Sequence, residues 1–162
     1  MAGIYIHIPF CKAKCRYCDF TSYPSKTAFV DAYMACLYKE MKLRAKELES
    51  KTFNTIYFGG GTPSFIDEKF IAGCMNQIKR LYKLDSDAEV TIEINPGTIT
   101  PEKVEVYKKA SCSDRAIKVI LYFTEEEHNK VLRVLNELEI QDCSDIVLID
   151  ATPDKPSASN VG

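Results

Sequence analysis

The hydrophobic pattern of this chain switches between two periods, and this alternation restricts the folds that it can adopt. Residues 3–8 alternate apolar and polar side chains, with Ile4, Ile6 and Ile8 on one face, as in a β-strand. Further strands are expected at 53–58, 88–94, 117–123 and 145–150, and helices at about 27–48, at 67–83, from Pro101 onward and at 125–139. Strands that alternate with helices predict an α/β fold with a parallel sheet and right-handed crossovers.

The starts of two helices carry capping signals. Ser25 or Thr27 is expected to cap the first long helix, whose apolar stripe begins at Phe29. Thr100 followed by Pro101 suits the cap and the first position of the third helix. The first turns of these helices should therefore be set by local side-chain chemistry.

Composition excludes several classes of function. The chain has 162 residues, of which 46% are hydrophobic and 27% charged, which is enough for one packed domain. A net charge of −2 offers no basic footprint for nucleic acid. No apolar run approaches the roughly 20 residues of a transmembrane helix, and the start does not read as a signal peptide. We therefore expect a cytoplasmic protein.

Three of the seven cysteines are clustered, with the spacing C-x3-C-x2-C. Three thiolates on one loop, from Cys11, Cys15 and Cys18, can ligate three irons of a cubane cluster and leave the fourth iron open, whereas most clusters have four cysteine ligands. Two alternatives remain, namely three reduced thiols or a zinc site with His7 as the fourth ligand. The other cysteines are not clustered, and Cys36 and Cys74 are expected to be small core residues on helices.

Two further signals follow predicted strands. The segment Gly-Gly-Gly-Thr-Pro at 59–63 follows the second strand, and Glu93 lies near the end of the third. Glycines let a backbone approach a ligand closely, although a tight turn would also explain them. Glu93 could equally be an outward-facing charge. Because active sites gather at the carboxyl ends of parallel strands, the cysteine loop, the glycine loop and Glu93 predict one site.

Together these motifs resemble a known family. C-x3-C-x2-C followed by GGGTP resembles the radical S-adenosylmethionine superfamily. Tyr-Ile-His-Ile-Pro-Phe before Cys11 and Asp-Phe after Cys18 resemble the oxygen-independent coproporphyrinogen III oxidase family, and within it the haem-chaperone branch. The oxidase branch usually carries another cysteine at the position of Phe20. The resemblance covers about residues 1–110.

The resemblance implies a fold and a set of ligands. The fold would be an incomplete radical-SAM (β/α) partial barrel with about five parallel strands. Cys11, Cys15 and Cys18 would hold a 4Fe-4S cluster. S-adenosylmethionine would contact a second set of residues, namely Tyr5, Glu93, Gly60, Gly61 and Thr62. Of these, Gly61 and Thr62 would also line the neighbouring substrate or second-cofactor space.

The resemblance also implies alternative functions. In the oxidase branch, radical cleavage of S-adenosylmethionine leads to decarboxylation of a porphyrinogen, whereas the chaperone branch binds and delivers haem. An electron donor such as a flavodoxin or ferredoxin would reduce the cluster. We expect residues 111–150 to form an unrecognised strand–helix–strand tail and residues 151–162 to form a disordered end. Because family members are several hundred residues long, we expect a truncated or rearranged form with poor or no turnover, or an inactive fragment.

Overall fold

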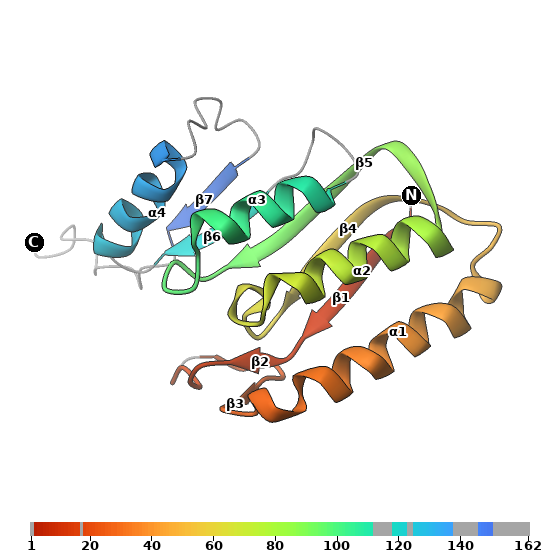
Figure 1. The fold of residues 1–162 in the computed structure, drawn as a ribbon, viewed down its shortest axis with the longest axis horizontal. Coiled ribbons are helices and arrows are strands. Elements are labelled where there is room, and N and C mark those ends of the chain that lie inside the picture. Colours follow the sequence, from red (N-terminus) through yellow and green to blue (C-terminus); the bar gives the residue numbers. More distant parts are fainter. Residues whose placement is uncertain (1, 17, 112–117, 123–124, 138–145, 151–162) are drawn as a thin grey trace, which may run out of the picture.

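The computed structural model describes residues 2–16, 18–111, 118–122, 125–137 and 146–150. Five strands form one parallel sheet in the order β1-β4-β5-β6-β7, so the strands are neighbours in the order in which the chain reaches them (Figure 1). Their bounds are Gly3–Ile8 for β1, Thr52–Gly60 for β4, Lys83–Ile94 for β5, Lys118–Tyr122 for β6 and Ile146–Asp150 for β7. The predicted α/β class and its parallel sheet are confirmed.

In the part of the chain that the structure describes, four helices and two short 3₁₀ turns connect the strands. Their bounds are Val30–Glu47 for α1, Glu68–Leu81 for α2, Pro101–Ala110 for α3, Glu125–Glu137 for α4, Thr27–Phe29 for η1 and Pro63–Phe65 for η2. Right-handed crossovers between successive neighbouring strands place all helices on the same side of a sheet. Accordingly, α1, α2 and α3 follow one another along one face of the sheet (Figure 1). This is the arrangement of an open, partial (β/α) barrel.

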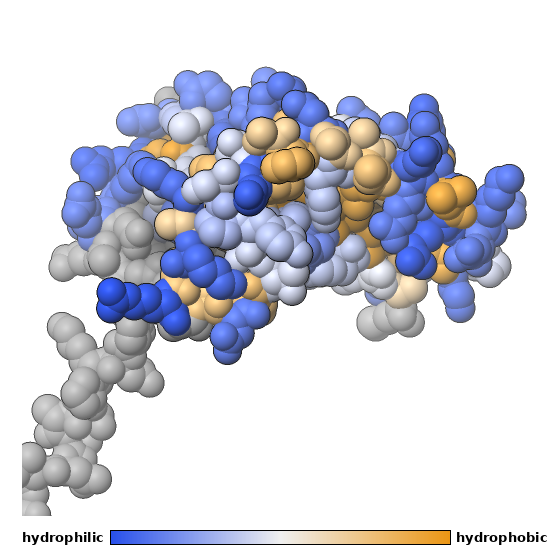
Figure 2. Space-filling view, turned by 90° about the horizontal axis from the view of Figure 1, so that it is seen from below, coloured by the Kyte–Doolittle hydropathy of each residue, from blue (hydrophilic) through white to orange (hydrophobic). Residues whose placement is uncertain are grey.

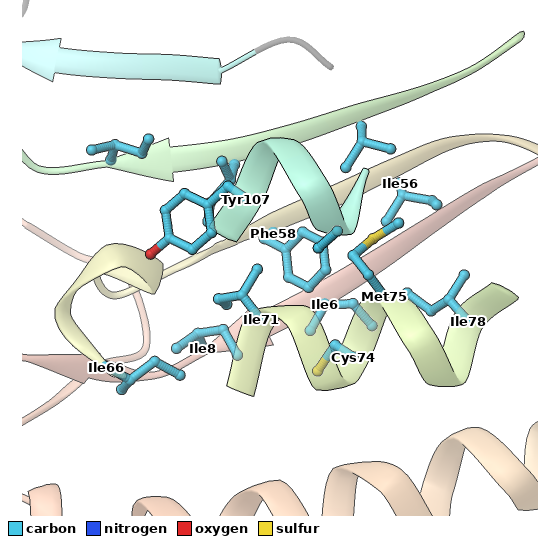
Figure 3. Packing of buried hydrophobic residues seen from close by; sticks show 14 of the residues in the cluster. Ile6, Ile8, Ile56, Phe58, Ile66, Ile71, Cys74, Met75, Ile78 and Tyr107 are labelled. Carbon is cyan, nitrogen blue, oxygen red and sulfur yellow. The ribbon is translucent and has the colours of Figure 1, made fainter. Parts of the chain in front are cut away.

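The core lies between this face of the sheet and the helices. Ile6 and Ile8 are 4% and 0% exposed, which confirms the buried face expected for the first strand. Phe58 of β4 lies among them, and side chains of α2 cover it (Figure 3). The helix side of this contact is made by Ile71, Cys74, Met75 and Ile78. A strand period of two and a helix period of 3.6 thus meet in one apolar layer.

The expected start of the first long helix is wrong. Neither Ser25 nor Thr27 caps it, because η1 precedes α1 and the residues at both caps, Lys26 and Phe29, make no side-chain capping bond. Phe29 is 60% exposed because it ends the 3₁₀ turn, outside the buried stripe of α1. By contrast, the Thr100 hydroxyl accepts a bond from the Lys103 amide, as expected for a cap.

Two further expectations need correction. Cys74 is buried as expected, but Cys36 is exposed, because it lies on the outer side of α1. The third strand begins at Lys83 rather than at 88. Its first half is rich in charged residues and shows no alternation of apolar and polar side chains, so the sequence pattern did not indicate it. Its pairing with β4 is irregular there, since Phe53 pairs with Leu84 but Thr55 pairs with Glu89.

The structure contains a short pair of strands that the sequence did not predict. Strand β2, Phe10–Cys11, pairs with β3, Tyr23–Pro24, on either side of the cysteine loop. Bonds from the Tyr23 amide to the Pro9 carbonyl and from the Ser25 amide to the Cys11 carbonyl, at 2.6 and 3.2 Å, close the base of this loop. Two-residue strands are too short to show a period.

The side of the molecule nearest α1 mixes charged side chains with separate hydrophobic ones (Figure 2). Leu43 of α1 is 70% exposed, and isolated surface apolar groups of this kind are ordinary. Among the helices that the structure describes, none is both long and apolar enough to cross a membrane.

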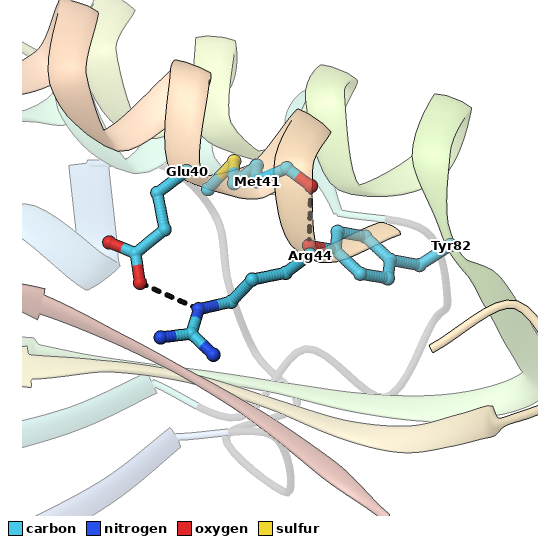
Figure 4. Close-up of polar contacts among 4 residues, drawn as sticks. All are labelled: Glu40, Met41, Arg44 and Tyr82. Carbon is cyan, nitrogen blue, oxygen red and sulfur yellow. Dashed lines mark hydrogen bonds and ion pairs between the residues drawn. The ribbon is translucent and has the colours of Figure 1, made fainter. Parts of the chain in front are cut away.

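Tyr82, which follows α2, ties the start of β5 to α1. Its hydroxyl donates to the Met41 carbonyl at 2.8 Å, next to an exposed Glu40–Arg44 ion pair at 2.7 Å (Figure 4). We expect Tyr82→Phe to lower the free energy of unfolding by about 1 kcal/mol, because the part-buried hydrogen bond from its hydroxyl to the Met41 carbonyl is lost. Glu40→Gln should leave it almost unchanged, because solvent screens that pair. Urea denaturation compares the two variants, and equal losses would contradict this.

Candidate functional site

The cysteine loop and the glycine loop lie together at the carboxyl edge of the sheet. The former begins where β1 ends and the latter where β4 ends, and β1 pairs with β4 from Gly3 to Ile8. The Gly61 amide donates to the Ile8 carbonyl and the Thr62 amide to the Phe10 carbonyl, each at 2.9 Å. Backbone bonds therefore fix the two motifs against each other.

The three clustered cysteines differ in their surroundings. Cys11 is buried on β2, and its Sγ accepts a hydrogen bond from the Thr62 hydroxyl at 3.5 Å. Cys15 is exposed and Cys18 half-buried, and a turn joins them through the Cys18 amide and the Cys15 carbonyl at 3.2 Å. Within the described ranges, no three His, Cys, Asp or Glu side chains are close enough to hold a metal ion. One thiol is therefore held in place, and the other two lie on the loop beside it.

These residues suit a soft metal group. Thiolates select zinc or iron–sulfur clusters over hard cations. A zinc site of three cysteines would need His7 as its fourth ligand, but both ring nitrogens of His7 are engaged. Its Nδ1 lies 3.0 Å from the Tyr5 hydroxyl and its Nε2 lies 2.9 Å from the Thr21 carbonyl oxygen. The donor set therefore favours a cluster held by thiolates alone.

The glycine loop fits closely against both neighbours. Gly60 has φ +121°, and a Cβ there would lie 2.8 Å from the ring of His7 and 3.1 Å from the Ile8 amide nitrogen. A Cβ on Gly61 would lie 2.8 Å from the Cys11 sulfur and 2.9 Å from the Phe10 carbonyl oxygen. Both positions need glycine, because the backbone passes so close to the cysteine loop.

The sheet face opposite the helices carries a polar aromatic cluster. The Tyr57 hydroxyl donates to Glu93 Oε1 at 2.7 Å, and the Tyr5 ring stacks on the Tyr57 ring with centroids 6.0 Å apart. In the register, Tyr5 pairs with Tyr57 and Tyr57 with Thr91, so one row of this cluster crosses three strands. Glu93 thus faces away from the helices, as the outward-facing alternative also has it, and the Tyr57 hydroxyl orients its carboxylate.

Burial and charge affect the acidity of this cluster. Desolvation and then the Glu93 carboxylate raise the pKa of Tyr5. The pKa of Tyr57 is raised more than that of Tyr5, by desolvation, by the hydrogen bond to Glu93 and by the charge of the Glu93 carboxylate. Both phenols therefore stay protonated at neutral pH. The Tyr57 hydroxyl therefore keeps donating to Glu93. Tyr5 itself is 58% exposed, on the sheet face that the helices do not cover.

All the site residues expected from the sequence therefore lie at one edge or on one face of the sheet. Tyr57 was missed, although it follows the same alternation on its strand as Tyr5 does on β1. Ser64 was missed too, and no pattern marks it, since its contacts are with residues about 31 to 39 positions away. His7 was considered only as a zinc ligand, and its contact with Thr21 depends on how the loop folds.

Comparison with known proteins agrees with this arrangement. The model of the radical SAM superfamily matches residues 5–150. The haem chaperone HemW of Buchnera aphidicola (Schizaphis graminum) is 35% identical over 138 residues, which cover 85% of this chain and 36% of the relative. HemW of Escherichia coli is 33% identical over 133 residues, 82% of this chain and 35% of the relative.

A solved structure shares the fold. The coproporphyrinogen III oxidase HemN of Escherichia coli, described as a radical SAM enzyme, matches 90% of this chain and 36% of its own, with TM-score 0.77 and 20% identity. The chain spans about a third of the length of these relatives. The chain belongs to the radical SAM superfamily, and within it matches the N-terminal part of the HemN-like family that contains the haem chaperones.

Proposed function

We propose that this chain forms the cluster and cofactor site of a radical SAM protein of porphyrin or haem metabolism. Cys11, Cys15 and Cys18 would hold a 4Fe-4S cluster, and S-adenosylmethionine would lie along the glycine loop. The observation that carries the proposal is the backbone lock between the two loops, from Gly61 to Ile8 and from Thr62 to Phe10. A cluster on the first loop would thereby adjoin a ligand on the second.

Each group would have a separate task toward the cofactor. Bound together, the cluster and S-adenosylmethionine would supply one-electron reductive cleavage of the sulfonium C–S bond, the electron coming from an external donor such as a flavodoxin or ferredoxin. Gly60 and Gly61 let the backbone approach the methionine part, and Thr62 keeps its hydroxyl on the Cys11 sulfur. Glu93, fixed by Tyr57, accepts hydrogen bonds from hydroxyl or amino groups. Tyr5 offers a ring face for packing.

The relatives suggest two substrates. The haem chaperones are named for haem and HemN for coproporphyrinogen III, and the higher sequence identity of the chaperones favours haem binding and delivery for this chain. Phe20 supports this choice, because the oxidase branch usually carries a cysteine there. Oxidase turnover is the second candidate, and its first step would need a low-potential donor such as a flavodoxin or ferredoxin.

Anaerobic reconstitution tests the cluster and the cofactor together. We expect about four iron and four sulfide per chain, as a cubane cluster requires, and an electron paramagnetic resonance signal that changes when S-adenosylmethionine is added. The change would report a cofactor bound at the open iron. Uptake of zinc in preference to iron, or a signal indifferent to the cofactor, would contradict the proposal.

Haem titration separates the two candidate functions. A Soret band that saturates with haem, without deoxyadenosine formation under dithionite, would support binding and delivery. Deoxyadenosine formed at ordinary radical-enzyme rates would show that the expected loss of turnover is wrong.

A further inference from the structure

Lys103 of α3 reaches across to the segment that follows the glycine loop. Its Nζ donates to the Ser64 carbonyl at 2.6 Å and to the Ile66 carbonyl at 3.0 Å. Hydrogen bonds from an ammonium group are stronger than neutral ones. Partial burial lowers the pKa of Lys103, while the charges of Glu68 and Asp67 oppose this. The cation therefore bonds the middle residue of η2, Ser64, and the residue that directly follows η2, Ile66.

Ser64 joins the same segment to the end of the third sheet strand. Its side chain is 0% exposed, and its Oγ accepts the Asn95 amide at 2.9 Å and lies 2.6 Å from the Thr98 hydroxyl. Asn95 directly follows β5 and stands two residues after Glu93. Ser64 stands two residues after Thr62. One buried hydroxyl thus connects the glycine loop with the strand end that carries Glu93.

We propose that Lys103 and Ser64 form a positioning link that holds the glycine loop and the Glu93 strand end at a fixed separation. Neither side chain would touch the cofactor. Both would act through the segments they join, so that Gly60, Thr62 and Glu93 present one surface to it. The effect on the cofactor rests on the proposed function, whereas the coupling of the two segments does not.

The need for such a link follows from the composition of the loop. Consecutive glycines have more backbone freedom than other residues, so the loop needs anchors outside itself. Removal of the ammonium group would leave two carbonyl oxygens without their donor, in a part-buried place where that is costly. The strain would fall on η2 and, through the Ser64 hydroxyl, on the turn at Asn95 and Thr98.

Hydrogen exchange of the reconstituted protein, measured without S-adenosylmethionine, tests the coupling. We expect Lys103→Met to speed amide exchange in both segments, 59–66 and 93–98, and Lys103→Arg to restore it, since a guanidinium can reach two carbonyls. Tyr107→Phe is the matched control on the same helix. The Tyr107 hydroxyl is buried with no hydrogen-bond partner in the described part of the chain, and its ring lies between α3 and α2 (Figure 3). Faster exchange in α3 alone would overturn the link.

Affinity for S-adenosylmethionine, measured by equilibrium dialysis, tests the positioning role. With cluster content unchanged, Lys103→Met should weaken binding about tenfold, the lower range for loss of an outer-shell partner, and Lys103→Arg should recover it. Unchanged affinity in Lys103→Met would overturn the positioning role. If Lys103→Met shows the faster exchange in both segments, but the wild-type protein with its cluster binds no S-adenosylmethionine, the proposed function fails and the coupling stands.

Discussion

Cys15→Ser protein should emerge from anaerobic reconstitution almost without iron or sulfide and without the brown colour of a cluster. A cluster on three thiolates has no spare protein ligand, and a serine hydroxyl is not a soft donor. The loss should exceed the roughly 10- to 100-fold fall in metal affinity that follows removal of outer-shell partners. Because Cys15 is exposed and its side chain makes no core contact, the variant should keep its melting temperature in the metal-free state.

Cys36→Ser is the matched control for that measurement. Cys36 is also an exposed, free cysteine, but it lies on α1, outside the cysteine loop. Its replacement should leave iron and sulfide per chain unchanged. A cluster that survives in Cys15→Ser protein, or is lost equally in Cys36→Ser protein, would show that C-x3-C-x2-C is not the ligand set.

Much of the fold could be predicted because its signals are local. The alternation of Ile4, Ile6 and Ile8 depends on one strand only, and the buried face of β1 follows from it. The Thr100 hydroxyl caps α3 by accepting a hydrogen bond from the amide of Lys103, only three residues away. In contrast, the capping residues expected for α1 were wrong, because an added 3₁₀ turn moved the helix start beyond Thr27. Short irregular turns leave no periodic trace.

The candidate site divides in the same way. The cysteine spacing, the glycine segment and Glu93 could be placed at one edge, because parallel strands end together. The residues that orient these groups could not be predicted. Tyr57 is 36 residues from Glu93 in the sequence, and Ser64 is 31 residues from Asn95. The hydrophobic period of a single strand shows which face of the sheet a side chain lies on, but not which distant residue it meets there.

Gly60→Ala should remove the response of the cluster signal to S-adenosylmethionine. Gly60 lies at φ +121°, where side-chain-bearing residues are rare, and its Cβ would lie 2.8 Å from the His7 ring. Backbone strain of this kind costs about 1–3 kcal/mol. The loop can avoid it only by moving away from His7 and the Ile8 amide, which would break the contact between the glycine and cysteine loops. Electron paramagnetic resonance with added cofactor measures this loss.

The matched control is Gly97→Ala. Gly97 lies in the turn after β5, is exposed, and its Cβ would meet only the Asn95 side-chain oxygen, at 3.0 Å. This variant should keep the cofactor response, and its free energy of unfolding should change less than that of Gly60→Ala. Chemical denaturation of both variants gives the comparison, because strain at Gly60 should lower stability as well as binding. If Gly60→Ala keeps both its stability and its response to the cofactor, the close passage of this loop past His7 is not what holds the site together.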